Sequence, residues 1–340
     1  MSETTRRAGE LLGDLVDGTD LVEIIDATGA SFGEAFLDGT LSGLRSRHAP
    51  SRGIALGDAI APGTRGPQSP SARTPQPDLV LLHTGRSGST LLARAIEQGS
   101  CDLLMLREPP LFARVVGLEA RDRPPAHALQ GLAWWYQQLA AERGQRLGLK
   151  LTSTALLAVG SLRAAYPQAS IVALLRDPLD VAASATAQPP PWFEAVKTSP
   201  VARARLARAH ARAGAGLPSP ATACAALWAT GTDLLLDIES VTFVGYREVV
   251  DDLAGTVARL LALTGESATR DRVAESLGDL ASVDAKDRGQ TSKPPPLADD
   301  VIERVHAITA PTIERLAAAG HGAITSSFRI PGRSAGGDDL

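Results

Sequence analysis

The sequence contains few cysteines and few aromatic residues. Only two cysteines, Cys101 and Cys224, occur in 340 residues, and aromatic residues make up 4% of the chain. Two cysteines cannot form a disulfide framework or a structural zinc site, which excludes the small disulfide-rich secreted domains. We therefore expect a reducing environment and a cytoplasmic protein.

Long apolar runs and an excess of basic residues are also absent. No stretch reaches the roughly 18 apolar residues of a membrane-spanning helix, and the N-terminal residues lack the apolar stretch of a signal peptide. The net charge is −4, from 34 basic and 38 acidic residues, whereas nucleic-acid binders are typically basic. We expect a soluble protein without a membrane or nucleic-acid partner, in which any recognition of phosphate is local.

The composition changes along the chain and predicts four regions. Residues 1–60 have apolar residues spaced as on one face of a helix, which predicts an N-terminal helical extension. Residues 61–78 are rich in proline and serine and predict a linker. Residues 79–330 predict an α/β domain, and residues 331–340 predict a flexible tail.

Short apolar runs alternate with amphipathic segments throughout the predicted α/β domain. Because parallel strands are buried on both faces, each run is typical of a strand in a parallel sheet covered by helices. The predicted fold is a three-layer α/β fold of the P-loop type. The runs are Leu79–Leu82, Leu103–Leu106, Leu147–Leu151, Ile171–Leu175 and Val241–Val244.

Residues 188–220 interrupt this alternation. They contain several arginines on a short predicted helix between proline-rich ends. Two interpretations stay open: a solvated helix on an insertion, or a lid whose cations face an anionic ligand.

A glycine-containing loop follows the first apolar run and leads into a predicted helix. Backbone N–H groups in such a loop point toward one position, where the helix dipole also favours an anion. Gly88 allows close approach of the backbone, and Ser87, Ser89 and Thr90 add hydroxyl groups. Arg86 supplies a planar cation suited to phosphate or sulfate oxygens. The lysine of the ATP-binding P-loop is missing, because Ser89 stands at its position.

A second candidate anion site follows the run that ends at Leu175. Arg176 comes directly after this predicted strand, where open α/β sheets bind ligands. Asp177 is a good helix cap and Pro178 suits the first helical position, so a helix is predicted from there. Ser184 lies further along the same helix and can offer a hydroxyl to the same anion. Alternatively, Arg176 only pairs with Asp180 on a capped helix.

These two segments resemble the donor-binding motifs of the sulfotransferase family. Arg86-Ser-Gly-Ser-Thr90 resembles the family's 5′-phosphosulfate loop, [KR]-S-G-[ST]-[ST], and Arg176 to Ser184 resemble its 3′-phosphate motif, R-[DN]-P-x-D-x-x-x-S. The resemblance covers residues 79–264 and is to bacterial members. It implies 3′-phosphoadenosine 5′-phosphosulfate (PAPS) as co-substrate, no metal, and a small-molecule acceptor with a hydroxyl or amine.

The resemblance also implies catalytic residues. Glu108 follows the second apolar run and precedes two prolines, and bacterial sulfotransferases often have a Glu-Pro there, in some with the glutamate as base. We expect burial to raise its pKa. Alternatively, it pairs with Arg107 or caps a turn. Lys150 ends the third run, where cytosolic animal members have Lys-Thr-His with histidine as base. That histidine is absent, so Glu108 is predicted as base, and Lys150 and Arg86 as cations that assist transfer. An exposed Lys150 is the alternative.

Other segments are less specific. Val244 to Val250 resemble, in altered form, a strand–turn–helix of bacterial members, and residues 284–293 resemble a basic loop that closes over the donor, although a solvated charge run explains them equally well. His83 is expected to be packed or hydrogen-bonded.

Two rival functions stay open: a P-loop kinase-like phosphotransferase, and a non-catalytic nucleotide-binding protein.

Overall fold

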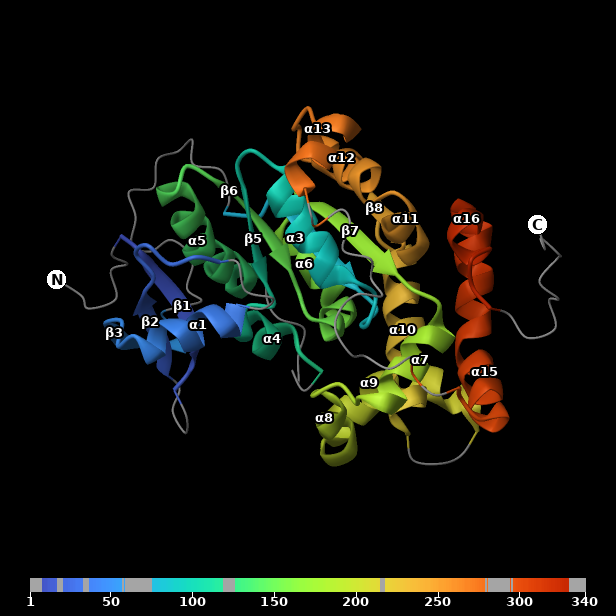
Figure 1. Ribbon diagram of the computed structural model, residues 1–340. Coiled ribbons are helices and arrows are strands. Elements are labelled where there is room, and N and C mark those ends of the chain that lie inside the picture. The colour runs from blue at the N-terminus through green and yellow to red at the C-terminus, as the bar shows by residue number, and fades with distance from the viewer. Residues whose placement is uncertain are drawn as a thin grey trace.

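The computed structural model describes residues 8–16, 21–32, 37–56, 58, 75–118, 126–214, 218–278, 280, 294 and 296–329. The predictions for residues 284–293, for the tail and for most of the linker lie outside the described residues. Figure 1 shows the N-terminal strands at one end of the molecule and the last two α-helices, α15 (Asp299–Leu316) and α16 (Gly322–Thr325), at the other.

A five-stranded parallel sheet forms the centre of the protein, with the strand order β5-β6-β4-β7-β8. Each of the five predicted apolar runs is a strand, so the predicted α/β fold class is confirmed. The strand that precedes the glycine-containing loop is the middle one. The strands are β4 (Leu79–His83), β5 (Leu103–Arg107), β6 (Arg146–Lys150), β7 (Ser170–Leu175) and β8 (Val241–Gly245).

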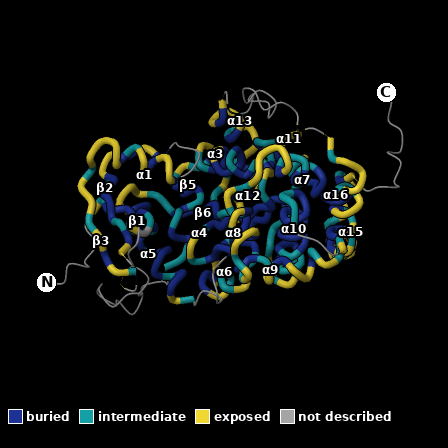
Figure 2. The backbone as a smooth tube through the Cα atoms, turned by 90° about the horizontal axis from the view of Figure 1, so that it is seen from below, coloured by how far each residue is buried: buried dark blue, intermediate teal, exposed yellow. Residues whose placement is uncertain are grey.

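Helices cover both faces of this sheet and complete three layers (Figures 1 and 2). Successive side chains of a strand point to opposite faces. Accordingly, Leu79 and Leu81 of β4 pack in a core with α3 (Ser89–Gly99), α12 (Leu253–Leu263) and α13 (Arg270–Leu277), whereas Val80 and Leu82 pack in a second core. That second core includes residues of α5 (Ala126–Glu142) and α6 (Val159–Ala165).

After β4 in the chain, the remaining described helices lie between and after the strands of this sheet. They are η1 (Ser153–Ala158), α4 (Pro110–Val116), α7 (Pro178–Ala187), α8 (Phe193–Thr198), α9 (Pro200–His210), η2 (Ala211–Ala213), α10 (Pro220–Leu236), α11 (Tyr246–Asp251) and η3 (Ala317–His321). As predicted, Asp177 caps α7, because its carboxylate accepts a hydrogen bond of 2.7 Å from the Leu179 N–H, and Pro178 is the first helical residue.

The prediction of a helical extension in residues 1–60 is wrong. The described part of the region forms a three-stranded antiparallel sheet of β1 (Glu10–Leu15), β2 (Leu21–Asp26) and β3 (Ser51–Ala55), together with the helix α1 (Leu37–Ser46). Paired apolar residues fit either a helix or a short strand, and the β-branched residues of β2 favour the strand. The buried residues of this sheet belong to the same core as Val80 and Leu82.

Helices α8, α9 and η2 lie within residues 188–220, the predicted insertion. Arg203 donates hydrogen bonds to the carbonyls of Val196 and Lys197, and Arg212 donates one of 2.9 Å to the carbonyl of Ile308. These two arginines therefore join helix ends and neighbouring helices. A lid function for this segment stays a prediction.

Candidate active site at the carboxyl end of the central sheet

The loop between β4 and α3, the first candidate anion site, is a tight turn with several residues at positive φ. Gly85, Arg86 and Gly88 have φ angles of +79°, +49° and +77°. Glycine adopts this left-handed conformation at little cost, whereas for Arg86 it costs about 1–2 kcal/mol. A Cβ atom at Gly88 would also lie 3.0 Å from Cε2 of Tyr246. Glycine at position 88 is therefore favoured by φ, and any larger residue would also crowd the neighbouring ring.

Two hydroxyl groups in this loop are buried without a hydrogen-bond partner. Ser87 is fully buried and Thr84 is 2% exposed. Within the described residues, neither Ser87 Oγ nor Thr84 Oγ1 has a partner. Because burying an unpartnered polar group is costly, such a group in a native site is typical of a position that a ligand or water satisfies.

The second candidate anion site is hydrogen-bonded to the first. Strand β7 lies beside β4, and Arg176, which follows β7, donates a hydrogen bond of 2.7 Å from Nη1 to the carbonyl of Arg86. The carbonyl of Arg176 accepts a bond of 2.9 Å from Trp228 Nε1, which fixes the backbone. The two motifs that the sequence separates by 90 residues therefore meet at one edge of the sheet.

The alternative interpretation of Arg176 is also partly correct. Its Nε lies 3.5 Å from Asp180 Oδ2, so the residue does pair along α7 while it contacts the loop. Ser184, further along α7, is partly exposed. Among the described residues the structure shows no hydrogen bond from the Ser184 side chain to Arg176 or to the loop. Arg176 thus makes the hydrogen bond that the described residues show between the two motifs.

The role of Tyr246 was missed from the sequence. This residue begins α11 after β8, and its ring lies under the guanidinium of Arg176, with the ring centroid 4.5 Å from Cζ. The same ring closes over Gly88. The available signal was its place directly after a strand of the sheet, at the edge where Arg86 and Arg176 also lie.

The predicted catalytic residues Glu108 and Lys150 are in direct contact. Oε1 of Glu108 forms an ion pair with Nζ of Lys150, and the Glu108 N–H donates to the Lys150 carbonyl at 2.7 Å. Lys150 is only 1% exposed, so the alternative of an exposed lysine is wrong. Its Nζ also lies 3.5 Å from Thr90 Oγ1. This contact joins the pair to the loop of residues 84–90 between β4 and α3, named the phosphate loop below for its proposed ligand.

Arg107 does not pair with Glu108, so that alternative is wrong as well. Arg107 Nη1 instead contacts Glu97 Oε2 at 2.7 Å. The second neighbour of the Glu108 carboxylate is His83, whose Nε2 lies 3.5 Å from Oε1. Nδ1 of His83 accepts a hydrogen bond of 3.0 Å from the Gly85 N–H, and the ring is buried, as expected from the sequence.

The expectation that burial raises the pKa of Glu108 is wrong in its net direction. Burial does raise it, but the interaction with the nearby His83 ring and the charge of Lys150 outweigh burial and lower the pKa of Glu108 to about 2. Burial lowers the pKa of Lys150, although Glu108 opposes this effect. Burial likewise lowers the pKa of His83. At neutral pH the site contains an ionised Glu108.

The fold and the site together define an α/β protein in which two candidate anion-binding motifs and a buried carboxylate–lysine pair meet at one sheet edge. The model of the sulfotransferase family matches residues 119–270, which confirms the resemblance found in the sequence and supports sulfuryl transfer as the class of activity. The match includes Arg176, Ser184 and Tyr246. It begins after the phosphate loop and Glu108, for which the assignment comes from sequence and geometry.

Several solved structures are similar to the chain. A sulfotransferase from Alicyclobacillus acidocaldarius is 20% identical, with a TM-score of 0.45 over 72% of this chain and 96% of that one. Sulfotransferase STF9 from Mycobacterium avium is 13% identical, with a TM-score of 0.46 over 72% and 77%. Mouse sulfotransferase SULT7A1, solved in complex with PAP, is 14% identical, with a TM-score of 0.35 over 73% and 84%. None of the curated proteins matches the chain.

Across the described ranges, no helix combines the length and apolar character needed to cross a membrane. In that same part of the chain, no group of three or more histidine, cysteine, aspartate or glutamate side chains is placed to hold a metal ion.

Proposed function

We propose that the protein transfers a sulfuryl group from PAPS to a hydroxyl or amine of a small molecule. The observation that carries this proposal is the hydrogen bond from Arg176 Nη1 to the Arg86 carbonyl. It joins a loop suited to a 5′-phosphosulfate to an arginine suited to a 3′-phosphate. A donor with phosphate at both ends of one nucleoside needs two such anion sites on one edge of the sheet.

The residues present fit this donor. Ser87 Oγ is buried without a hydrogen-bond partner among the described residues, and so is Nε of Arg176, whose ion pair with Asp180 Oδ2 spans 3.5 Å. Both are hydrogen-bond donors, and they lie on the two motifs that would hold the two anionic ends. Arg86, Ser87, Gly88, Ser89 and Thr90 would bind the 5′-phosphosulfate, and Arg176 and Ser184 the 3′-phosphate.

The carboxylate–lysine pair supplies the chemistry of transfer. The acceptor oxygen or nitrogen uses an electron pair to form a bond to sulfur, and the bond from sulfur to the donor's 5′-phosphate oxygen breaks. The electron pair of that bond remains on the leaving phosphate, beside Lys150 and Arg86. Glu108 takes the acceptor's proton. A carboxylate with a low pKa is a weak base, so we expect proton transfer late, when the forming bond has made that proton acidic.

Calorimetric titration tests the donor. We expect 3′-phosphoadenosine 5′-phosphate (PAP), the product left by the donor, to bind without magnesium, and binding to be lost in Arg176→Ala. The matched control is Arg304→Ala, which removes an arginine whose pair with Asp300 lies on the surface of α15. Binding of ATP with magnesium in place of PAP would overturn the proposal and favour a phosphotransferase.

A further inference from the structure

His83 links the phosphate loop to the carboxylate proposed as the base. It is the last residue of β4, the middle strand of the sheet, and its ring is 5% exposed. Its two ring nitrogens face different elements. Nδ1 faces the Gly85 N–H in the loop, and Nε2 faces Glu108, which follows β5.

The contact with Gly85 determines which nitrogen bears the proton. Nδ1 accepts the hydrogen bond of 3.0 Å from the Gly85 N–H, so it bears no hydrogen of its own. A neutral imidazole then has its single proton on Nε2, the ring nitrogen that lies 3.5 Å from Oε1 of Glu108. The charged groups next to the ring are Glu108 and Lys150, and burial favours the neutral ring.

This arrangement leaves one carboxylate oxygen of Glu108 for the reaction. Among the described residues, the contacts of the carboxylate with Lys150 and with His83 both fall on Oε1. Oε2 is therefore the oxygen that can receive a proton from an acceptor. Glu108 itself has a φ of +52°, a strained backbone that the bond from its N–H to the Lys150 carbonyl helps to hold.

We propose that His83 is a positioning residue that holds Oε1 of Glu108 with Nε2–H while Nδ1 anchors the phosphate loop. The proposal rests on the proposed function. During transfer the acceptor's proton moves to Oε2, the new bond to sulfur forms, and the donor's sulfur–oxygen bond breaks with its electron pair left on phosphate. His83 keeps its own proton throughout, so it orients the base and exchanges nothing with the reactants.

A pair of variants separates the two contacts of the ring. In His83→Asn the amide oxygen replaces Nδ1 and the side chain is too short to reach Glu108. In His83→Gln the amide nitrogen replaces Nε2 and the bond to Gly85 is lost. We expect His83→Asn to bind PAP like the parent protein but to convert PAPS to PAP about 100-fold more slowly at saturating donor. We expect His83→Gln to bind PAP more weakly while its turnover at saturating donor is largely kept.

Two outcomes of that experiment overturn the proposal. Parent-like turnover of PAPS in His83→Asn would show that the contact with Glu108 is unused. Loss of PAP binding and turnover together in His83→Asn, with an unchanged melting temperature, would show that the ring serves the loop alone. A parent protein that does not bind PAP would overturn the proposed function instead.

The ring can also be observed without turnover, by ¹⁵N NMR of the labelled full chain. We expect the Nε2–H tautomer at neutral pH. We also expect the pKa of His83 to fall in Glu108→Gln, because the Glu108 charge raises it in the parent. The Nδ1–H tautomer, or a His83 pKa that Glu108→Gln does not change, would overturn the proposed arrangement even if PAP does not bind.

Discussion

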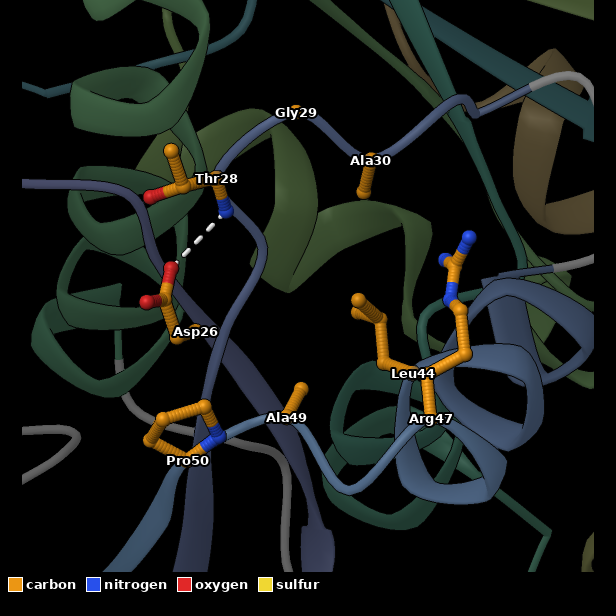
Figure 3. Close-up of a pocket in the computed structure, with 8 residues that line it drawn as sticks. All are labelled: Asp26, Thr28, Gly29, Ala30, Leu44, Arg47, Ala49 and Pro50. Atoms are coloured by element: carbon orange, nitrogen blue, oxygen red, sulfur yellow. Dashed lines mark hydrogen bonds between the residues drawn. The ribbon is translucent and has the colours of Figure 1, made fainter.

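The carboxyl end of the central sheet and the N-terminal sheet differ in whether their polar groups have hydrogen-bond partners. Within the described residues, six buried side-chain atoms have no hydrogen-bond partner, and three of them belong to Thr84, Ser87 and Arg176; a fourth, Nε2 of His83, lies 3.5 Å from Oε1 of Glu108. The N-terminal region has an open pocket of about 310 Å³ between its turns and α1 (Figure 3), yet its Asp26 already accepts a bond of 2.8 Å from the Thr28 N–H. Unsatisfied buried polarity, rather than hollow volume, therefore distinguishes the candidate active site.

Removing the Glu108 carboxylate should have the largest effect on activity at the carboxyl end of the sheet. In Glu108→Gln we expect conversion of PAPS to PAP to fall by about 10²- to 10⁴-fold, since a positioned general base contributes that much. PAP binding, measured by calorimetry, should persist because Arg86 and Arg176 are intact. Glu303→Gln on the exposed face of α15 is the matched control. Full turnover in Glu108→Gln would remove the proposed mechanism and leave the fold assignment unaffected.

The same carboxylate should make the protein sensitive to acid. The pKa of Glu108 is about 2 in the folded protein, below its ordinary value of 4.5, so its contribution is present above pH 4.5 and is lost as pH falls through 2. This shift corresponds to about 3 kcal/mol of unfolding free energy. Urea unfolding at neutral pH and near pH 2 should show a smaller loss in Glu108→Gln than in the parent. Equal losses would contradict the low pKa.

Much of this end of the molecule is predictable from the sequence. The five apolar runs and the capped helix at Pro178 follow from local patterns, and the position of Arg86 and Arg176 after strands follows from the same patterns. Their direct contact also requires β4 and β7 to be neighbours, and the strand order is not visible in the sequence. The burial of Lys150 and the low pKa of Glu108 do not, because they depend on which charges meet in space. In β2 the local pattern was ambiguous between helix and strand, and packing against the rest of the core decided the outcome.

The aromatic cover of the loop should have an intermediate effect. Tyr246→Leu removes the ring that lies 4.5 Å from the Arg176 guanidinium, an interaction of about 0.5–2 kcal/mol. We therefore expect PAP affinity to fall by about 2- to 30-fold, with turnover at saturating donor less affected. Tyr246→Phe keeps the ring face and is the matched control, so a loss as large in Tyr246→Phe would show that the hydroxyl rather than the ring acts.

Changes in the N-terminal pocket should have the smallest effect. Arg47 lies exposed on its rim, and the carboxylate of Asp26 is satisfied within its own turn, so Arg47→Ala and Asp26→Asn disturb no buried unpartnered group. We expect each to change the unfolding free energy by no more than about 1 kcal/mol and to leave PAP affinity and PAPS turnover unchanged. Calorimetry and the turnover assay check this directly. If either variant weakened PAP binding, the N-terminal pocket would contribute to function. Unsatisfied buried polar groups would then no longer distinguish the functional region from the N-terminal one.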